Sequence, residues 1–222
     1  MAGWLTGRPS LLCDLDGTLV DSLTALRNVH RTFLRTRGAE PQAGEFERYN
    51  GILLRDVLVA LKSTYALEGD PSDLLAEYEA LVDDAYLDVL PNAGAVPLLE
   101  HAFARGWGVA IVTSGRRDRA AAWLTRHGLA PFVHTVVGAE DATRGKPDPA
   151  PYASALEAVG ADPRSSWAVE DSDAGIISAA AAGVARVVLV GQEGQDRPEV
   201  TRCRDLIAVR ELLEAEEPAI DR

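Results

Sequence analysis

Short apolar runs and longer amphipathic stretches follow one another along this chain, and their order changes once. Residues 11–15 (LLCDL) form an apolar run stopped by Gly17, a pattern that predicts a buried strand. A helix capped by Asp21 is expected to follow and to end near Arg37. Residues 41–89 then show helical character and no clear alternating strand. One strand is therefore followed by a block of helices.

From Pro91 onward, predicted strands and helices alternate. The helices are expected at 94–105, 116–127, 149–159 and 173–182, and the strands at 109–113, 133–137, 167–169 and 184–190. Strands separated by helices of this length form right-handed crossovers and a parallel sheet covered on both faces. The polar stretch 191–222 is expected to hold one more short helix, at 205–215.

These patterns predict an α/β fold with a doubly wound, Rossmann-like parallel sheet. Its core would comprise residues 1–21 and 91–222, and residues 22–90 would be a helical domain inserted after the first strand.

Composition and charge narrow the classes of protein. The chain has 222 residues, of which 47% are hydrophobic and 25% charged, so general disorder is excluded. The net charge of -12 disfavours nucleic acid and anionic membranes as partners. Two cysteines make no disulfide framework, and neither a signal peptide nor an apolar run of membrane-spanning length occurs. We expect a cytoplasmic protein that is a monomer or a weak homodimer.

Polar side chains follow four of the predicted strand regions, at the edge where open α/β sheets bind ligands. Asp14 and Asp16 follow the first strand, and Thr113, Ser114 and Gly115 follow the second. Further along the chain come Lys146, which is one of only two lysines, and the pair Glu170 and Asp171.

This set of side chains indicates phosphoryl-transfer chemistry. Four carboxylates at one edge repel one another, and hard oxygen ligands in this number suit Mg²⁺. A magnesium ion and Lys146 can neutralise a phosphoryl group, which the Thr-Ser-Gly turn can cradle. Of Asp14 and Asp16, one can act as nucleophile and the other as general acid and base, if Gly17 lets the chain turn.

The four motifs that carry these residues resemble those of the haloacid dehalogenase superfamily. They are DLDGTLVDS (14–22), VTSG (112–115), GKPDP (145–149) and VEDSDAG (169–175), in the family's order and at its usual separations. The resemblance covers residues 11 to about 191.

The resemblance implies a role for each of these residues. Asp14 would be the nucleophile that forms an aspartyl-phosphate, and Asp16 the acid and base. Thr113 and Ser114 would bind phosphate and Lys146 would be the family's lysine. Asp171, helped by Glu170, would bind Mg²⁺ together with Asp14 and the Asp16 backbone carbonyl. The helical insertion would be the cap that closes over the site.

Finer features favour a phosphatase of a small phosphorylated metabolite, a sugar or polyol phosphate. TSGRRDRAAAW (113–123) resembles phosphatases of glycerol phosphate and deoxy-sugar phosphates. GILLRDVL (51–58) resembles the cap loop of phosphoglycolate phosphatases, which remain an alternative. A β-phosphoglucomutase-like activity is a second alternative, although Leu26 stands where the mutase usually has histidine. A non-catalytic binding protein on the same fold is a third.

Substrate choice is expected to depend on Arg55 and Gly51 in the insertion and on Arg116 after the second strand. An arginine in the cap loop can form bidentate hydrogen bonds to a substrate. The alternative for Arg55 is a solvent-facing helix residue paired with Asp56 or another neighbour. Asp173, in the last motif, is expected to cap the helix that follows it.

Overall fold

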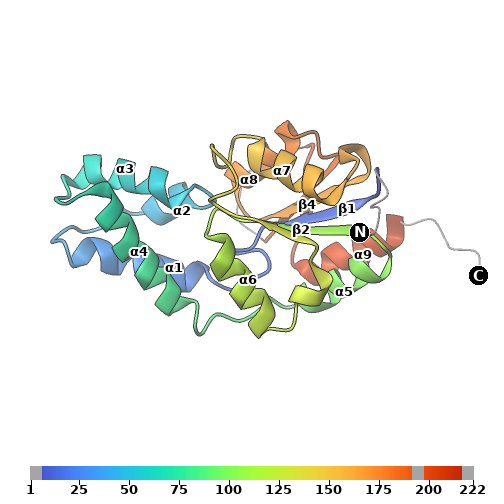
Figure 1. The fold of residues 1–222 in the computed structure, drawn as a ribbon, viewed down its shortest axis with the longest axis horizontal. Coiled ribbons are helices and arrows are strands. Elements are labelled where there is room, and N and C mark those ends of the chain that lie inside the picture. The colour runs from blue at the N-terminus through green and yellow to red at the C-terminus, as the bar shows by residue number, and fades with distance from the viewer. Residues whose placement is uncertain (1–6, 192–197, 217–222) are drawn as a thin grey trace, which may run out of the picture.

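The computed structural model describes residues 7–191 and 198–216, and Figure 1 shows a sheet with flanking helices beside a separate group of helices. Six parallel strands form the sheet in the order β3-β2-β1-β4-β5-β6. The strands are β1 (Ser10–Cys13), β2 (Gly108–Val112), β3 (Thr135–Val137), β4 (Trp167–Glu170), β5 (Arg186–Val190) and β6 (Thr201–Cys203). The expected Rossmann-like fold class is therefore confirmed.

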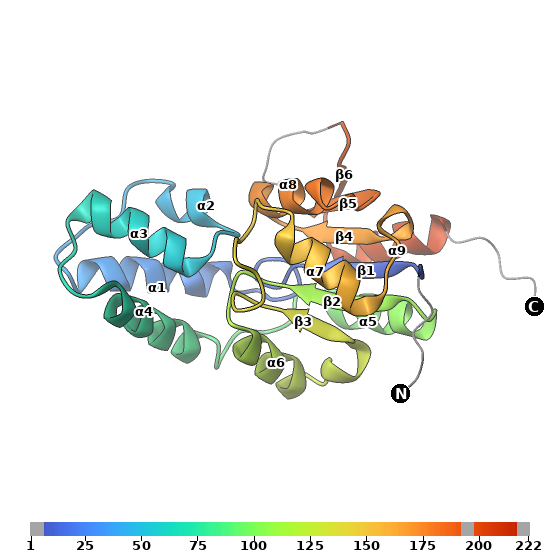
Figure 2. The same ribbon diagram turned by 45° about the horizontal axis from the view of Figure 1, so that its top comes forward.

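Helices cover both faces of this sheet. Successive residues of a strand point to opposite faces, and both faces carry apolar side chains that must be buried. In β1, Leu11 and Cys13 pack with one hydrophobic cluster and Leu12 with another. The first cluster lies under α5 (Ala95–Ala104), α6 (Arg117–Arg126) and α9 (Leu206–Glu216). The second lies under α7 (Ala150–Val159) and α8 (Asp173–Ala181), on the other face (Figure 2). Burial on both faces explains why the strands are continuous apolar runs.

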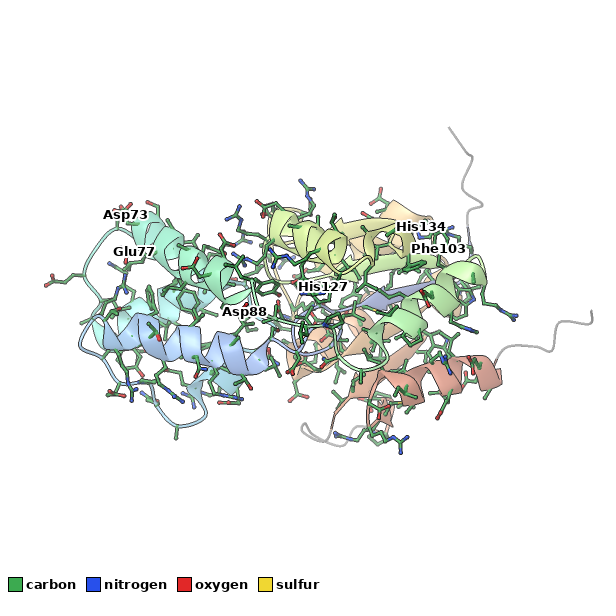
Figure 3. All side chains as sticks on the ribbon, turned by 90° about the horizontal axis from the view of Figure 1, so that it is seen from below. Asp73, Glu77, Asp88, Phe103, His127 and His134 are labelled. Carbon is green, nitrogen blue, oxygen red and sulfur yellow. The ribbon has the colours of Figure 1, made fainter. Side chains whose placement is uncertain are left out.

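The helical block between the first two strands contains α1 (Leu23–Arg35), α2 (Glu45–Tyr49), α3 (Leu54–Tyr65) and α4 (Pro71–Ala85). Its two connections to the sheet lie side by side, since the Asp21 amide donates to the Leu90 carbonyl oxygen at 3.0 Å. Viewed with all side chains in Figure 3, Asp73 and Glu77 on α4 lie at the opposite end of the molecule from Phe103 and His134. The helices thus extend beyond the carboxyl ends of the strands.

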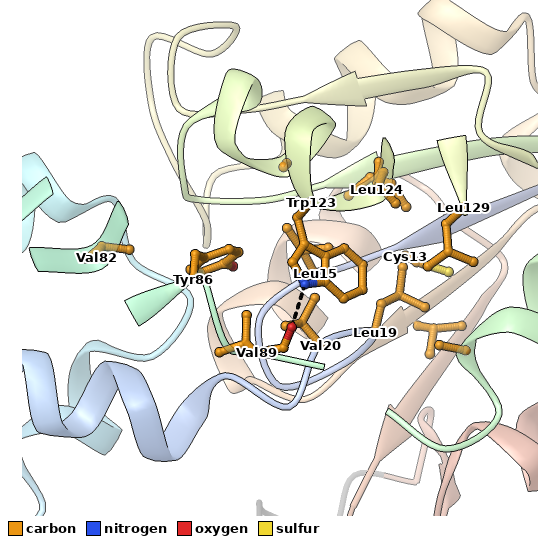
Figure 4. Packing of buried hydrophobic residues seen from close by; sticks show 14 of the residues in the cluster. Cys13, Leu15, Leu19, Val20, Val82, Tyr86, Val89, Trp123, Leu124 and Leu129 are labelled. Atoms are coloured by element: carbon orange, nitrogen blue, oxygen red, sulfur yellow. Dashed lines mark hydrogen bonds between the residues drawn. The ribbon is translucent and has the colours of Figure 1, made fainter. Parts of the chain in front are cut away.

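The exit of the helical block is fixed by packing against α6. The indole Nε1 of Trp123 donates to the Val89 carbonyl oxygen at 3.0 Å, as the dashed line in Figure 4 shows. Leu15, Leu19 and Val20 belong to the same buried cluster. A hydrogen bond inside this apolar cluster satisfies two polar groups that would otherwise be buried unpaired.

Three local features differ from the sequence expectations. Strand β6 at Thr201–Cys203 was not expected, and it pairs with β5 at the edge of the sheet. Ser22, not Asp21, occupies the N-cap position of α1 and makes no side-chain cap bond. Ser172, not Asp173, caps α8 by accepting a hydrogen bond from the Gly175 amide.

Among the described helices, none combines the length and the hydropathy needed to cross a membrane. Residues 1–6, at which we expect no signal peptide, lie outside the described part of the chain.

Candidate active site

The register of the central strands brings the carboxylates together. Cys13 in β1 pairs with Ile111 in β2 and with Val169 in β4, so the three strands end at the same level. The amide of Asp14 continues the ladder by donating to the Val169 carbonyl oxygen at 2.9 Å. The side chain of Asp14 is therefore placed beside those that follow β2 and β4.

Glycine at position 17 lets the chain turn tightly after β1. Gly17 has φ +83°, and a Cβ built there would lie 2.2 Å from the Asp171 Oδ2 atom. Any side chain would therefore be strained and would collide with the carboxylate. At Gly175 the backbone is equally close to Glu170, since a Cβ would lie 1.9 Å from its Cδ atom.

Lys146 is the electrostatic centre of the site. Its buried Nζ atom donates to Asp14 Oδ1 and to Glu170 Oε1, each at 2.6 Å, and to the Val112 carbonyl oxygen at 2.9 Å. All three donor positions of the ammonium are used. One lysine therefore joins the ends of β1, β2 and β4.

Glu170 receives further hydrogen bonds from neutral donors. The Tyr152 hydroxyl on α7 donates to Oε1 at 2.7 Å, and the Ser172 hydroxyl donates to Oε2 at 3.0 Å. With Lys146 these make three donors to one buried carboxylate, which is how a buried charge is tolerated. Both carboxylate oxygens of Glu170 therefore have hydrogen-bond donors, and its negative charge lies against Lys146.

Burial dominates the proton affinities here. It raises the pKa of Asp14 well above its usual range, although the nearby Lys146 charge pulls the other way. Burial and then the Glu170 charge raise the pKa of Asp171 to about 7. Burial alone would lower the pKa of Lys146, but the charges of Asp14 and Glu170 outweigh it and raise that pKa. Without a metal ion, burial therefore favours the protonated forms of Asp14 and Asp171.

The residues present suit a divalent cation with oxygen ligands. Asp14, Glu170 and Asp171 each place one carboxylate oxygen within 4.8 Å of the others. The Oδ2 atom of Asp14 is buried and has no hydrogen-bond partner in the described structure. An unpaired buried carboxylate oxygen beside a second acidic group is the donor set that Mg²⁺ prefers.

Asp16 is held by both segments that connect the helical block to the sheet. Its Oδ1 atom accepts a hydrogen bond from the Ser22 hydroxyl at 2.7 Å and another from the Tyr86 hydroxyl. Ser22 immediately precedes α1 and Tyr86 immediately follows α4. The position of this carboxylate is therefore tied to the position of the helices, a link that the sequence reasoning missed.

The turn after β2 contacts the helical block directly. The Gly115 amide donates to Thr113 Oγ1 at 3.0 Å, and the Ser114 hydroxyl donates to the Gly51 carbonyl oxygen at 2.6 Å. Next to Gly51, the side-chain Nδ2 atom of Asn50 donates to Asp171 Oδ2 at 2.9 Å. Asn50 was also missed, although an Asn-Gly pair is a turn signal that the sequence displays.

A cavity of about 120 Å³ lies between the strand ends and the helical block. Asp14, Asp16, Thr113, Ser114 and Gly115 line one side of it. The opposite side is largely apolar and includes Leu26, Phe46, Ile52, Leu54, Val57 and Val82. Gly51 and the polar side chains of His30, Tyr49, Asn50, Tyr78, Glu79 and Arg119 complete the lining. A polar end beside the carboxylates thus faces an apolar wall.

Two of the three expected specificity residues do not line this cavity, whereas Gly51 does. Arg55 donates instead to the carbonyl oxygens of Ala142 and Thr143, at 3.3 and 3.0 Å, and lies 3.9 Å from Asp56. The arrangement matches the alternative reading of Arg55 as a helix residue paired with its neighbours.

Arg116 likewise does not line the cavity, and it pairs with Asp118 and Asp83. The arginine that lines the cavity is Arg119, in the first turn of α6. Its position could have been read from the sequence, because it lies four residues before the buried Trp123 and therefore on the same side of the helix.

Comparison with known proteins agrees with this geometry. Residues 11–189 match the family described as haloacid dehalogenase-like hydrolase. Hexitol phosphatase A of Escherichia coli is 35% identical over 78% of each chain. Validoxylamine A 7'-phosphate phosphatase of Streptomyces hygroscopicus subsp. limoneus is 32% identical over 78% of this chain and 81% of its own.

The fold has close counterparts among solved structures. β-Phosphoglucomutase from Clostridium difficile has 16% sequence identity and a TM-score of 0.84, over 94% of this chain and 96% of its own. At that identity the similarity concerns the fold alone. The family match, in contrast, spans all four motifs of the site, and the chain belongs to the haloacid dehalogenase-like hydrolase family.

Proposed function

We propose that the chain is a Mg²⁺-dependent phosphatase that hydrolyses a small phosphorylated metabolite, a sugar or polyol phosphate, through an aspartyl-phosphate. The observation that carries the proposal is the state of Asp14. Lys146 anchors one oxygen of this carboxylate, while the other has no hydrogen-bond partner in the described structure. The names of the hexitol and validoxylamine phosphate phosphatases support the substrate class.

In the first step, a carboxylate oxygen of Asp14 attacks the phosphorus, and the bond from phosphorus to the leaving oxygen breaks. Protonated Asp16 gives its proton to that oxygen, which leaves as an alcohol. In the second step, Asp16 takes a proton from water as the water oxygen attacks the aspartyl-phosphate. Inorganic phosphate is released and the carboxylate of Asp14 is restored.

Asp14, Asp171 and the backbone carbonyl of Asp16 are the groups we propose to hold Mg²⁺, with Glu170 next to them. The bound ion supplies positive charge that offsets the phosphoryl oxygens and the carboxylates. Thr113, Ser114 and the Gly115 amide orient the phosphoryl group, and Lys146 favours the ionised form of Asp14 and holds the carboxylate in place.

We further propose that residues 22–90 act as the cap of this site. The contacts of Asn50 with Asp171 and of Gly51 with Ser114 support this role, as do the cap residues that line the cavity. A closed cap excludes water from the first step and leaves it to enter for the second. The mutase alternative loses support because Leu26 lines the cavity with an apolar side chain.

The test is release of inorganic phosphate from p-nitrophenyl phosphate and from a panel of phosphorylated metabolites. We expect EDTA to remove activity and Mg²⁺ to restore it, with Ca²⁺ a poor substitute because it prefers looser coordination. Full activity in EDTA would contradict the metal's role. No release from any compound with Mg²⁺ present would contradict the phosphatase.

A further inference from the structure

The cavity wall away from Asp14 has little positive charge to offer a substrate. Among the described residues that line the cavity, Arg119, on α6, is the one arginine, and there is no lysine. Arg119 is largely buried and binds two carboxylates: Glu79, and Asp83 at 2.7 Å from its Nε atom. Both carboxylates come from α4. Arg116 also reaches Asp83, at 3.5 Å, but it pairs with Asp118 as well. Three carboxylates therefore face two guanidinium groups, which leaves no net positive charge there.

The other group on this wall that can carry positive charge is His30, and it is also paired. Its Nε2 atom lies 3.1 Å from the buried Glu45 Oε2 atom, and its Nδ1 atom lies 3.2 Å from the Tyr78 hydroxyl. The Glu45 carboxylate lies directly against the ring, so the imidazole offers no uncompensated positive charge. Both ring nitrogens already have partners, so the imidazole does not offer a free donor to an anion.

Most of the remaining wall is apolar, apart from Tyr49, Asn50 and Tyr78, and the last two already pair with Asp171 and His30. An anionic group moved from water against Leu54, Val57 and Val82 would lose its hydration without gaining a partner. An uncharged carbon skeleton would gain from the same contacts, since its C–H faces can pack on these side chains and on Phe46.

We propose that this enzyme selects phosphate monoesters whose leaving group is electrically neutral, and that the Glu79–Arg119–Asp83 cluster rejects leaving groups bearing a carboxylate or a second phosphate. The inference rests on the proposed phosphatase function and specifies its substrate class. Glu79 and Asp83 keep the one cation of the cavity wall occupied, so an anionic tail meets excess negative charge there.

A matched pair of esters tests the proposal: 2-phosphoglycolate and 2-hydroxyethyl phosphate. They have the same number of carbons and differ in a carboxylate against a hydroxymethyl group. We expect kcat/KM to be at least about tenfold higher for 2-hydroxyethyl phosphate. Equal values, or a preference for 2-phosphoglycolate, would overturn the inference.

The Glu79→Gln variant tests the cluster itself. Releasing Arg119 from one carboxylate should shift the ratio of the two kcat/KM values toward 2-phosphoglycolate by about tenfold. Glu77→Gln is the control, because this substitution removes the same charge from the same helix. Glu77 pairs with Arg37 and does not line the cavity. An unchanged ratio in Glu79→Gln, or an equal shift in Glu77→Gln, would refute the role of the cluster.

Binding separates this inference from the proposed function. Titration calorimetry of both esters against Asp14→Asn protein, in Mg²⁺, compares their affinities without turnover. Tighter binding of 2-hydroxyethyl phosphate supports the charge selection even if no ester is hydrolysed by the wild type. Tighter or equal binding of 2-phosphoglycolate contradicts it, whatever the activity.

Discussion

Replacing Lys146 by methionine tests the electrostatic balance of the site. The substitution keeps an unbranched side chain but removes the buried ammonium that bonds Asp14 and Glu170, each at 2.6 Å. Two buried carboxylates then face each other without compensation. Breaking a buried ion pair by removing one partner destabilises a protein by about 3–5 kcal/mol. In a chain of this size that corresponds to a fall in Tm of about 6–20 °C.

Urea denaturation at pH 8 in EDTA measures the loss, and the same experiment in Mg²⁺ should recover part of it because the ion supplies the missing charge. Lys62→Met is the control. Lys62 is the other lysine of the chain, and its Nζ atom donates to the Leu67 and Gly69 carbonyl oxygens on the cap. Its loss should amount to about 0.5–1.5 kcal/mol. If Lys146→Met stays within about 1 kcal/mol of the wild type at pH 8 in EDTA, the reasoning fails.

Other expected outcomes concern the three aspartates. Asp14→Asn should abolish turnover and leave the fold intact because the change is isosteric, and activity within about tenfold of wild type would refute the nucleophile assignment. Asp16→Ala should slow hydrolysis of alkyl phosphates more than that of p-nitrophenyl phosphate, whose leaving group needs little protonation; equal losses would argue against the acid role. Burial raises the pKa of Asp171 to about 7. At pH values between the ordinary aspartate pKa and about 7, the folded metal-free protein therefore keeps a proton on Asp171 that the unfolded chain has released. The stability of the metal-free protein therefore falls as pH rises through this range. Mg²⁺ displaces that proton, so the Mg²⁺-induced rise in Tm should be larger at pH 8 than at pH 5.5, and equal shifts would count against Asp171 as a ligand.

The strands that position the site were predictable because they are buried on both faces. β1, β2 and β4 are apolar runs that end in polar residues, and this pattern can be read locally. β6 was missed for the opposite reason. Its residues Thr201 and Arg202 are half-buried and polar, and an edge strand of three residues leaves no hydrophobic pattern.

The helix caps show how close neighbours compete. At the start of α8, Ser172 and Asp173 are both good cap residues, and only their backbone conformation separates them. Ser172 is extended and accepts from the Gly175 amide, whereas Asp173 is already helical. In addition, the Ser172 hydroxyl donates a hydrogen bond to Glu170, and local sequence patterns do not predict this contact.

Arg55 and Arg119 show what decides which arginine can reach a substrate. Along α3, Leu54 and Val57 line the cavity, while Arg55, Leu58 and Lys62 line a separate groove beside α4. Residues three and four apart share a helix face and adjacent residues do not, so Arg55 is directed away from the cavity once Leu54 and Val57 face it.

Arg119 reaches the cavity by the same rule, since it lies four residues before the buried Trp123 and shares its side of α6. The position of a residue along the helix, however, predicts only which way its side chain points. It does not predict which charged side chains will pair with it. The partners Glu79 and Asp83 come from α4, a helix of the inserted block that is distant from Arg119 in sequence. From its sequence motif alone, an arginine such as Arg55 is expected to bind an anion. In the folded chain, the arginine that lines the cavity is Arg119, whose guanidinium already binds two carboxylates. For this reason the assembled cluster, rather than the arginine motif, supports a neutral leaving group.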